Sequence, residues 1–470
     1  MYTSVVGRTF LKEYNRRHGR DYSAKEFFDK ELFQLVFNHE KYLLWAGNSP
    51  FVQGLSSKKP FFEPAERLDN LEKLHVKIGG GERDASIALG FPASESKGYA
   101  TTSGLVTDLA VPADEEAVYL SWIGGTLSLG VAGGYTILFD DPEITYATFE
   151  GWKHYRRFLN NPLFDKFPPY KLNTWNGQWL AYRYDSEFDS NFIFATLVGE
   201  KIINSDINGI EINTVSWAKL FFNLSSSLDI ESATAYVFSL GSTNKTVGFI
   251  PFQFQSGKTL IATYQALFGG ETEYKIRRTS EFESWFGRHI KRACEMGSIG
   301  LQALRPETLK NYFGDRQNLK FVSPEAEQKK GESEDDFKAR REKANVKTKE
   351  TILTYQTYKT WLIAMLSKNN KTEVSDYSRD IAQALVRYRY GGKKNDRKTL
   401  LEGNFFKTSK NEMLKALDTI VSDETVEQDI AEKMNGLRDQ VHFLSKEDFT
   451  YFVLLLKFDY AYAERNHVNQ

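Results

Sequence analysis

The stretch from Leu43 to Phe62 brings a turn, an amide side chain and two lysines into one short span, which suits contact with nucleic acid. Residues 47–50 break the regular backbone and expose the amide of Asn48. Lys58 and Lys59 follow in a segment of small residues that allows close approach to a phosphate backbone. An amide held beside phosphate-binding lysines is able to read the edge of a base. The candidate DNA-binding residues here are Asn48, Ser49, Gln53, Ser57, Lys58 and Lys59.

The alternative for this stretch is an ordinary surface loop between core elements. A second basic cluster surrounds Gly391 and Gly392, where Tyr388 and Tyr390 alternate with basic residues. Cations bind the backbone of a single strand while aromatic rings stack on its bases, although a solvated loop has the same composition. The candidate strand-binding residues are Arg387, Arg389, Lys393, Lys394, Arg397 and Lys398.

The composition predicts a globular protein without a general attraction to polyanions. The chain has 470 residues, of which 41% are hydrophobic and 14% aromatic, so two or three domains are expected. Its 61 basic and 62 acidic residues almost cancel, leaving a formal net charge of −1. Contact with nucleic acid therefore has to come from local basic patches.

The sequence predicts neither a disulfide nor a membrane span. Cys294 is the only cysteine, which excludes an intrachain disulfide or a cysteine-rich zinc site and suits a reducing cytosol. The first residues lack the apolar run of a signal peptide, and no window reaches the roughly 18 apolar residues of a membrane span. We expect a cytoplasmic protein with no membrane partner.

No motif predicts catalysis, a metal site or a cofactor. The seven histidines are scattered, without the spacing of a metal site. Residues 256–259 read Ser-Gly-Lys-Thr, like the end of a phosphate-binding loop, but Phe252 stands where that motif requires glycine. We therefore expect a protein that is not an enzyme and has no catalytic residues, no metal and no cofactor.

Hydrophobic periodicity predicts an α+β fold whose N-terminal region is mixed and contains a mostly antiparallel sheet. Residues 1–40 and the segment Thr148–Leu159 have helical spacing. The glycine-rich run Leu120–Phe139 suits either two apolar strands joined by glycine turns or a small-residue segment packed tightly against a neighbour. Strands are predicted at Trp179–Tyr184, Phe192–Val198, Thr234–Leu240 and Thr246–Ile250.

A charge-dense run marks the clearest domain boundary. We predict an N-terminal recognition region at 1–322, a charged connector at 323–350, and an all-α C-terminal helical bundle at 351–470. The connector suits either an exposed helix or a mobile linker. The helices of the bundle are expected at 352–366, 377–390, 412–420, 427–437 and 446–462.

Short motifs and this architecture together resemble the large subunit of type I CRISPR interference complexes (Cascade), particularly the type I-B branch. The motifs are GNSPFV at 47–52 and GWKHYRRFL at 151–159, with the glycine-rich middle and the helical C-terminus. The chain lacks the paired Cys-x-x-Cys motifs of part of that branch. The resemblance implies a non-catalytic subunit of an antiviral defense complex, which recognises the protospacer-adjacent motif (PAM) in double-stranded DNA and promotes duplex opening.

The resemblance also implies the partners. They are a guide RNA, double-stranded DNA, displaced single-stranded DNA of the R-loop, the backbone, 5′-handle and small subunits of the ribonucleoprotein, and a recruited helicase-nuclease. The C-terminal bundle would act like the small subunit and hold the displaced strand. Two other classes stay open on the residues alone, namely a metal-dependent nuclease and a purely structural interaction protein.

Overall fold

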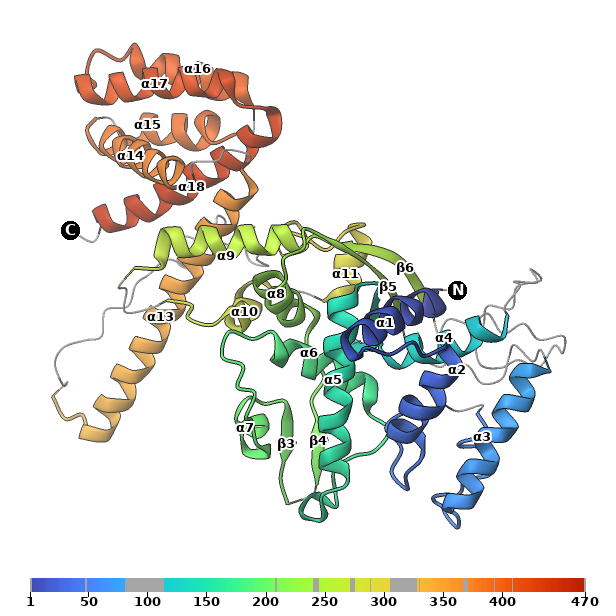
Figure 1. Cartoon of the computed structure of the whole chain (residues 1–470). Helices are drawn as coiled ribbons and strands as arrows, with labels where there is room; N and C mark the ends of the chain where they lie inside the picture. The colour runs from blue at the N-terminus through green and yellow to red at the C-terminus, as the bar shows by residue number, and fades with distance from the viewer. Residues whose placement is uncertain are drawn as a thin grey trace. The chain divides into compact units, whose positions relative to one another are not determined.

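The structure is a computed structural model of the whole chain (Figure 1). It describes residues 2–46, 49–80, 114–207, 209–239, 245–270, 275–287, 289–304, 328, 330–366, 371–392, 394–407 and 409–468. Within these ranges, no helix combines the length and the apolar character needed to cross a membrane.

The chain divides into two compact units. The first comprises Met1–Gly257, Arg278–Glu283 and Gly287–Leu304. The second comprises Lys258–Arg277, Ser284–Phe286 and Arg305–Gln470. The sequence predicted a boundary at the charged run after residue 322, whereas this division also assigns residues 258–277 to the helical unit.

The first unit begins with helices, as residues 1–40 predict. Ser23 starts α2 with a capping box, in which Glu26 N donates to Ser23 Oγ (3.2 Å) and Ser23 N donates to Glu26 Oε2 (3.0 Å). α2 runs directly into η1, a π-helix whose end is marked by a hydrogen bond from Asn38 N to Phe33 O (2.8 Å). The helices are α1 (Tyr2–His18), α2 (Ala24–Phe27), η1 (Phe28–Phe37) and α3 (Pro64–Gly79).

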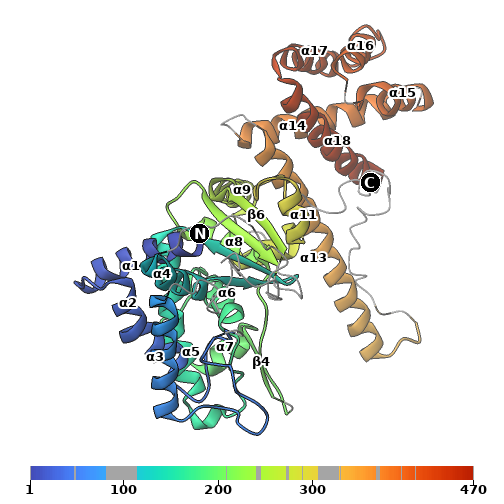
Figure 2. The same ribbon diagram turned by 90° about the vertical axis from the view of Figure 1, so that its right-hand side faces the viewer.

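The glycine-rich middle of the sequence forms a helix and then a hairpin. α4 (Glu115–Thr126) packs against α1 through backbone contact, because a Cβ added at Gly124 would lie 1.9 Å from Thr3 O. The two helices lie side by side in both views (Figure 1, Figure 2). Of the two alternatives for this run, tight packing therefore holds for its first half, and paired strands hold for its second.

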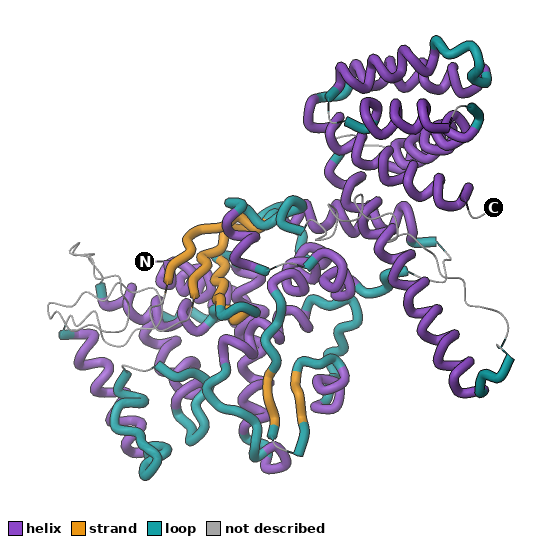
Figure 3. The backbone as a smooth tube through the Cα atoms, turned by 180° about the vertical axis from the view of Figure 1, so that it is seen from behind, coloured by secondary structure: helices purple, strands orange, loops and turns teal. Residues whose placement is uncertain are grey.

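The main sheet has four antiparallel strands in the order β1-β2-β5-β6 (Figure 3). Gly133 and Gly134 form the turn between β1 and β2 with φ values of +89° and +75°, which glycine adopts without strain. The predicted strands at 234–240 and 246–250 are confirmed as β5 and β6. The strands are β1 (Leu129–Val131), β2 (Tyr135–Phe139), β5 (Ala233–Ser239) and β6 (Lys245–Phe252), with a separate hairpin of β3 (Ile203–Ser205) and β4 (Ile210–Ile212).

Two predicted strands are wrong. Trp179–Tyr184 belongs to α6 (Leu172–Arg183), and most of 192–198 belongs to α7 (Phe194–Gly199). α6 is buried on nearly all sides against α5 (Pro142–Leu159), where Trp179 Nε1 donates to Ala147 O (2.7 Å). A helix buried all round loses the polar face that reveals helical periodicity, so its aromatic residues resemble those of a strand.

Shorter helices complete the first unit. Ser256 and Lys258 lie inside the helix α9, so the Ser-Gly-Lys-Thr run has helical backbone and does not form a phosphate-binding loop. The remaining elements are η2 (Pro162–Phe164), α8 (Trp217–Ser227), η3 (Thr279–Glu281), α11 (Ile290–Glu295), and two helices that belong to both units, α9 (Phe254–Phe268) and α10 (Phe282–Phe286).

The second unit is helical, which confirms the predicted C-terminal bundle. The described part of the charged run, from residue 334, is an exposed helix that continues into the bundle, which is one of the two alternatives considered. α14 packs along α18, and α16 packs along α17 (Figure 1). Its helices are α13 (Glu334–Met365), α14 (Lys371–Tyr390), α15 (Lys394–Leu400), η4 (Leu401–Phe405), α16 (Lys410–Val421), α17 (Gln428–Phe443) and α18 (Lys446–Val468).

A buried ion pair links α13 to α18. Lys359 Nζ lies 3.1 Å from Asp459 Oδ1, and both side chains are 1% exposed. Ser378 Oγ also donates to Asp459 Oδ2 (2.8 Å). Tyr264 in α9 donates to Gln356 of α13 (2.7 Å), so a fragment that starts at residue 351 would lack part of this unit's packing.

Candidate nucleic-acid interface

Residues 49–62, which we call the recognition loop, are anchored from beneath by apolar side chains. Phe51 and Val52 are 1% and 3% exposed, and the Phe51 ring stacks on Phe37 of η1 with centroids 4.5 Å apart. A short turn follows, in which Ser56 N donates to Lys59 O (2.9 Å) and Lys59 N donates to Ser56 O (3.0 Å). The buried anchors fix the start of the loop, and the closed turn fixes the backbone that carries Ser57 and Lys58.

The structure places the predicted residues of this loop differently from one another. Gln53, Ser57, Lys58 and Lys59 are exposed, as the sequence analysis expected. Ser49 is wholly buried and its backbone oxygen accepts from Val52 N (3.1 Å) and Gln53 N (3.0 Å), so it organises the turn and its side chain is not exposed, contrary to the sequence prediction. The prediction at Asn48 lies outside the described residues.

The two lysines differ in their surroundings. Lys59 Nζ lies 2.5 Å from Glu66 Oε1 of α3 and 5.0 Å from the Phe62 ring centroid. This hydrogen bond from Lys59 is the largest cause that lowers the pKa of Glu66. Lys58 has no ion pair within the part of the chain that the structure describes, and its full charge faces solvent. Lys58 is therefore the stronger electrostatic contact for a phosphate group.

The basic cluster of the helical unit is largely used inside the protein. Arg397 is 6% exposed and donates to Tyr388 O (2.7 Å), Asp423 Oδ2 (2.8 Å) and Thr425 Oγ1 (2.8 Å). Arg389 is 8% exposed and is paired with Glu464. These two arginines join helices of the unit, and their guanidinium groups are not free to bind a strand.

The other members of this cluster are less confined. Arg387 is exposed but lies between Glu427 (3.1 Å) and Asp429 (2.5 Å), so its charge is balanced locally. Lys398 is half-buried. The predictions at Lys393 and at the Lys394 side chain lie outside the described residues. The sequence indicated the basic content of this cluster but not its acidic partners, which lie 13 to 75 residues away along the chain.

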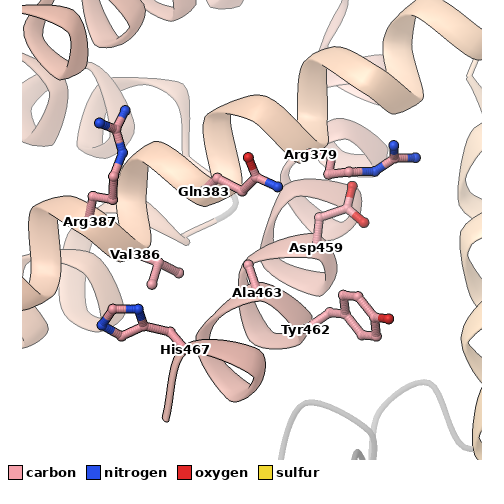
Figure 4. Close-up of a pocket in the computed structure, with 8 residues that line it drawn as sticks. All are labelled: Arg379, Gln383, Val386, Arg387, Asp459, Tyr462, Ala463 and His467. Atoms are coloured by element: carbon pink, nitrogen blue, oxygen red, sulfur yellow. The ribbon is translucent and has the colours of Figure 1, made fainter. Parts of the chain in front are cut away.

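A cavity of about 250 Å³ lies between α14 and α18 in the helical unit (Figure 4). Arg379, Gln383 and Arg387 line it from α14, four residues apart, while Tyr462 and His467 line it from α18. Sequence analysis missed this cavity, although the i, i+4, i+8 spacing on α14 is visible in the sequence. Its cations face carboxylates, since Arg379 Nη1 lies 3.5 Å from Asp376 and Arg387 is paired as described above.

Within the described ranges, no three side chains of His, Cys, Asp and Glu gather as a metal site would require. Cys294 is buried, and burial raises the pKa of its thiol to about 11. Such a thiol stays protonated and is a poor nucleophile.

Comparison with protein-family models, with curated proteins and with solved structures found no match to this chain.

Proposed function

We propose that this chain is a non-catalytic DNA-recognition subunit of an RNA-guided complex, the counterpart of the large subunit of a type I Cascade. It reads a short flanking motif in duplex DNA, promotes opening of the duplex, and helps to hold the displaced strand. Its partners are the guide RNA and the other subunits of the complex.

The observation that carries this proposal is the form of the recognition loop. Its anchors Phe51, Val52 and Phe62 are buried, while Gln53, Ser57 and Lys58 between them are exposed. Lys58 supplies a free cation for the phosphate backbone, and an amide such as that of Gln53 suits the donor and acceptor pattern of a base edge. Asn48 is kept as a second reader on its sequence position alone.

The two-unit division gives further support. A separate helical unit suits a part that acts after the duplex has opened, while the first unit carries the recognition loop. In the helical unit, Lys398 is a better candidate for strand contact than Arg389 and Arg397, which are engaged in internal pairs. Lys393 and Lys394 are kept as candidates on their sequence positions alone.

The test is reconstitution with a guide RNA and backbone subunits, followed by binding to target duplexes whose flanking base pairs are randomised. We expect enrichment of one flanking motif, loss of affinity as salt rises, and no cleavage of the bound DNA by the complex alone. Equal binding to every flank would contradict a recognition role. Metal-dependent cleavage by the chain alone would support the nuclease class, and absence of any DNA binding would support a structural protein.

A further inference from the structure

The segment that leads into the recognition loop starts at the C-terminal end of η1. The last carbonyl groups of a helix have no partner within the helix, so they need donors from elsewhere. Leu43 N satisfies Val36 O at 3.1 Å. Leu35 O and Lys41 O, which lie on either side of the chain's exit from η1, receive their hydrogen bonds from one buried arginine.

That arginine is Arg156 of α5, and it is 6% exposed. Its Nε and Nη2 donate to Leu35 O (3.0 and 2.8 Å), while Nη1 donates to Lys41 O (2.8 Å). All of these acceptors are backbone carbonyls, and the negative end of the η1 dipole favours a cation at this position. Arg156 therefore fixes the path of residues 35–41 against α5.

A second arginine closes the other end of the loop. Arg67 of α3 is 9% exposed. Its Nε donates to Asn38 Oδ1 (3.1 Å) and its Nη1 donates to Phe62 O (2.9 Å). Asn38 is the first residue after η1 and Phe62 is the last residue of the recognition loop, so one side chain joins the end of η1, which precedes the loop, to the exit of the loop.

His39 directly follows Asn38, and the positive charges of both guanidinium groups act on it. The pKa of His39 is lowered to about 4, mainly by burial and then by the positive charges of Arg156 and Arg67. His39 is therefore neutral at physiological pH. Two cations gather here, and the acceptors of the hydrogen bonds described above are a side-chain amide and backbone carbonyls.

We propose that Arg67 and Arg156 are positioning residues that hold the recognition loop in its DNA-reading conformation. This inference rests on the proposed function. A loop fixed before binding does not lose conformational freedom when it meets the duplex, so its contacts discriminate between base pairs more sharply. The planar guanidinium fork reaches several acceptors at once, which a lysine ammonium on a flexible stem does not reproduce.

The first arm of the test needs no DNA. Hydrogen–deuterium exchange is measured on the full chain for the parent, Arg67→Gln and Arg156→Gln, with Arg157→Gln as control. Arg157 is the next residue of the same helix, and it is exposed. In Arg67→Gln and Arg156→Gln we expect the amide exchange rate to rise about tenfold or more in peptides covering 38–46 and 49–62. The exchange rates in α4 and α6 should stay unchanged, and the control Arg157→Gln should behave like the parent.

The second arm measures binding of the reconstituted complex to duplexes with the preferred flank and with a scrambled flank. Arg67→Gln and Arg156→Gln should lose about tenfold or more of the affinity for the preferred flank and keep their affinity for the scrambled one. Arg67→Lys should lose the same affinity for the preferred flank as Arg67→Gln, because a positive charge alone does not join Asn38 to Phe62.

Several results would overturn the positioning role. They are unchanged exchange in the loop, exchange that rises equally in α4 and α6, unchanged flank discrimination, or full rescue by Arg67→Lys. If the parent complex itself ignores the flanking sequence, the proposed function fails instead. The exchange arm then still decides whether the two arginines hold the loop.

Discussion

Replacement of Gly124 by alanine tests whether α1 and α4 touch through their backbones. A Cβ at Gly124 would lie 1.9 Å from Thr3 O, and a Cβ at Gly7 would lie 1.9 Å from Leu120 O. Both neighbours are backbone oxygens, which have no rotamer to change. The helices therefore have to move apart by about 1 Å or more before ordinary contact is reached. That movement also stretches the hydroxyl hydrogen bond between Thr3 and Ser121, which is 2.7 Å long.

The magnitude follows from three opposing effects. Overpacking of a tight contact costs about 1–3 kcal/mol, and the stretched hydroxyl hydrogen bond costs about 1 kcal/mol. The higher helix propensity of alanine stabilises α4 by about 1 kcal/mol. We expect Gly124→Ala to lower the free energy of unfolding by about 2 kcal/mol, and to lower the midpoint of thermal unfolding of the first unit by about 4–8 °C.

The assay is calorimetry of the full chain together with a matched control in α17. Gly436 is exposed in mid-helix, and no atom lies within 4 Å of a Cβ added there. The same substitution, Gly436→Ala, should therefore stabilise the second unit by about 0.5–1 kcal/mol. Gly7→Ala repeats the test from α1, and the double variant with Gly124→Ala should cost less than the sum of the two, since one displacement relieves both clashes.

A Gly124→Ala protein as stable as the parent would refute the close backbone contact. A Gly436→Ala protein that is destabilised would refute the comparison of the two sites. Additive costs at Gly7 and Gly124 would mean that the helices separate in different ways, and the contact would then not be shared.

Three further outcomes are expected. Lys58→Gln should lower the slope of log affinity against log salt by about 1 in the reconstituted complex, and Lys59→Gln should lower it less because of Glu66; equal slopes would contradict this difference. Asp459→Asn should destabilise the second unit by about 3–5 kcal/mol, because Lys359 is left buried without a counterion; an unchanged denaturant midpoint would contradict it. Burial, with Arg157 and Lys153, lowers the pKa of His154 from 6.5 to about 4. Since the unfolded chain binds this proton and the native chain does not, stability should fall by roughly 1 kcal/mol from pH 6.5 toward 4; His154→Gln should remove this loss, and an identical pH profile would count against it.

The sequence by itself determined the class of fold and most of its elements. Helices with one apolar and one polar face, such as α5 and α16, were predicted because their periodicity records burial on one side. β5 and β6 were predicted because their aromatic and β-branched residues lie between turn residues. The exposure of Lys58 followed from the turn chemistry on either side of it.

Tertiary structure decided the features that depend on distant neighbours. α6 read as a strand because its aromatic residues are buried on nearly all sides, which removes the helical period. The glycines of α4 were compatible with strand turns or with tight packing, and only their contact with α1 distinguishes the two alternatives. Ser49 looked like a surface residue, but it is buried, and its carbonyl oxygen accepts the hydrogen bonds that close the turn.

Charge provides the clearest case of this division. Arg397 and Arg389 are basic residues in the sequence, yet Asp423, in the connection between α16 and α17, and Glu464 of α18 neutralise them. Arg156 reads as part of a basic helical face, but it binds carbonyls 121 and 115 residues earlier in the chain. A sequence shows which residues carry charge, whereas whether that charge meets solvent, a carboxylate or a backbone carbonyl is determined by packing between segments far apart in the chain.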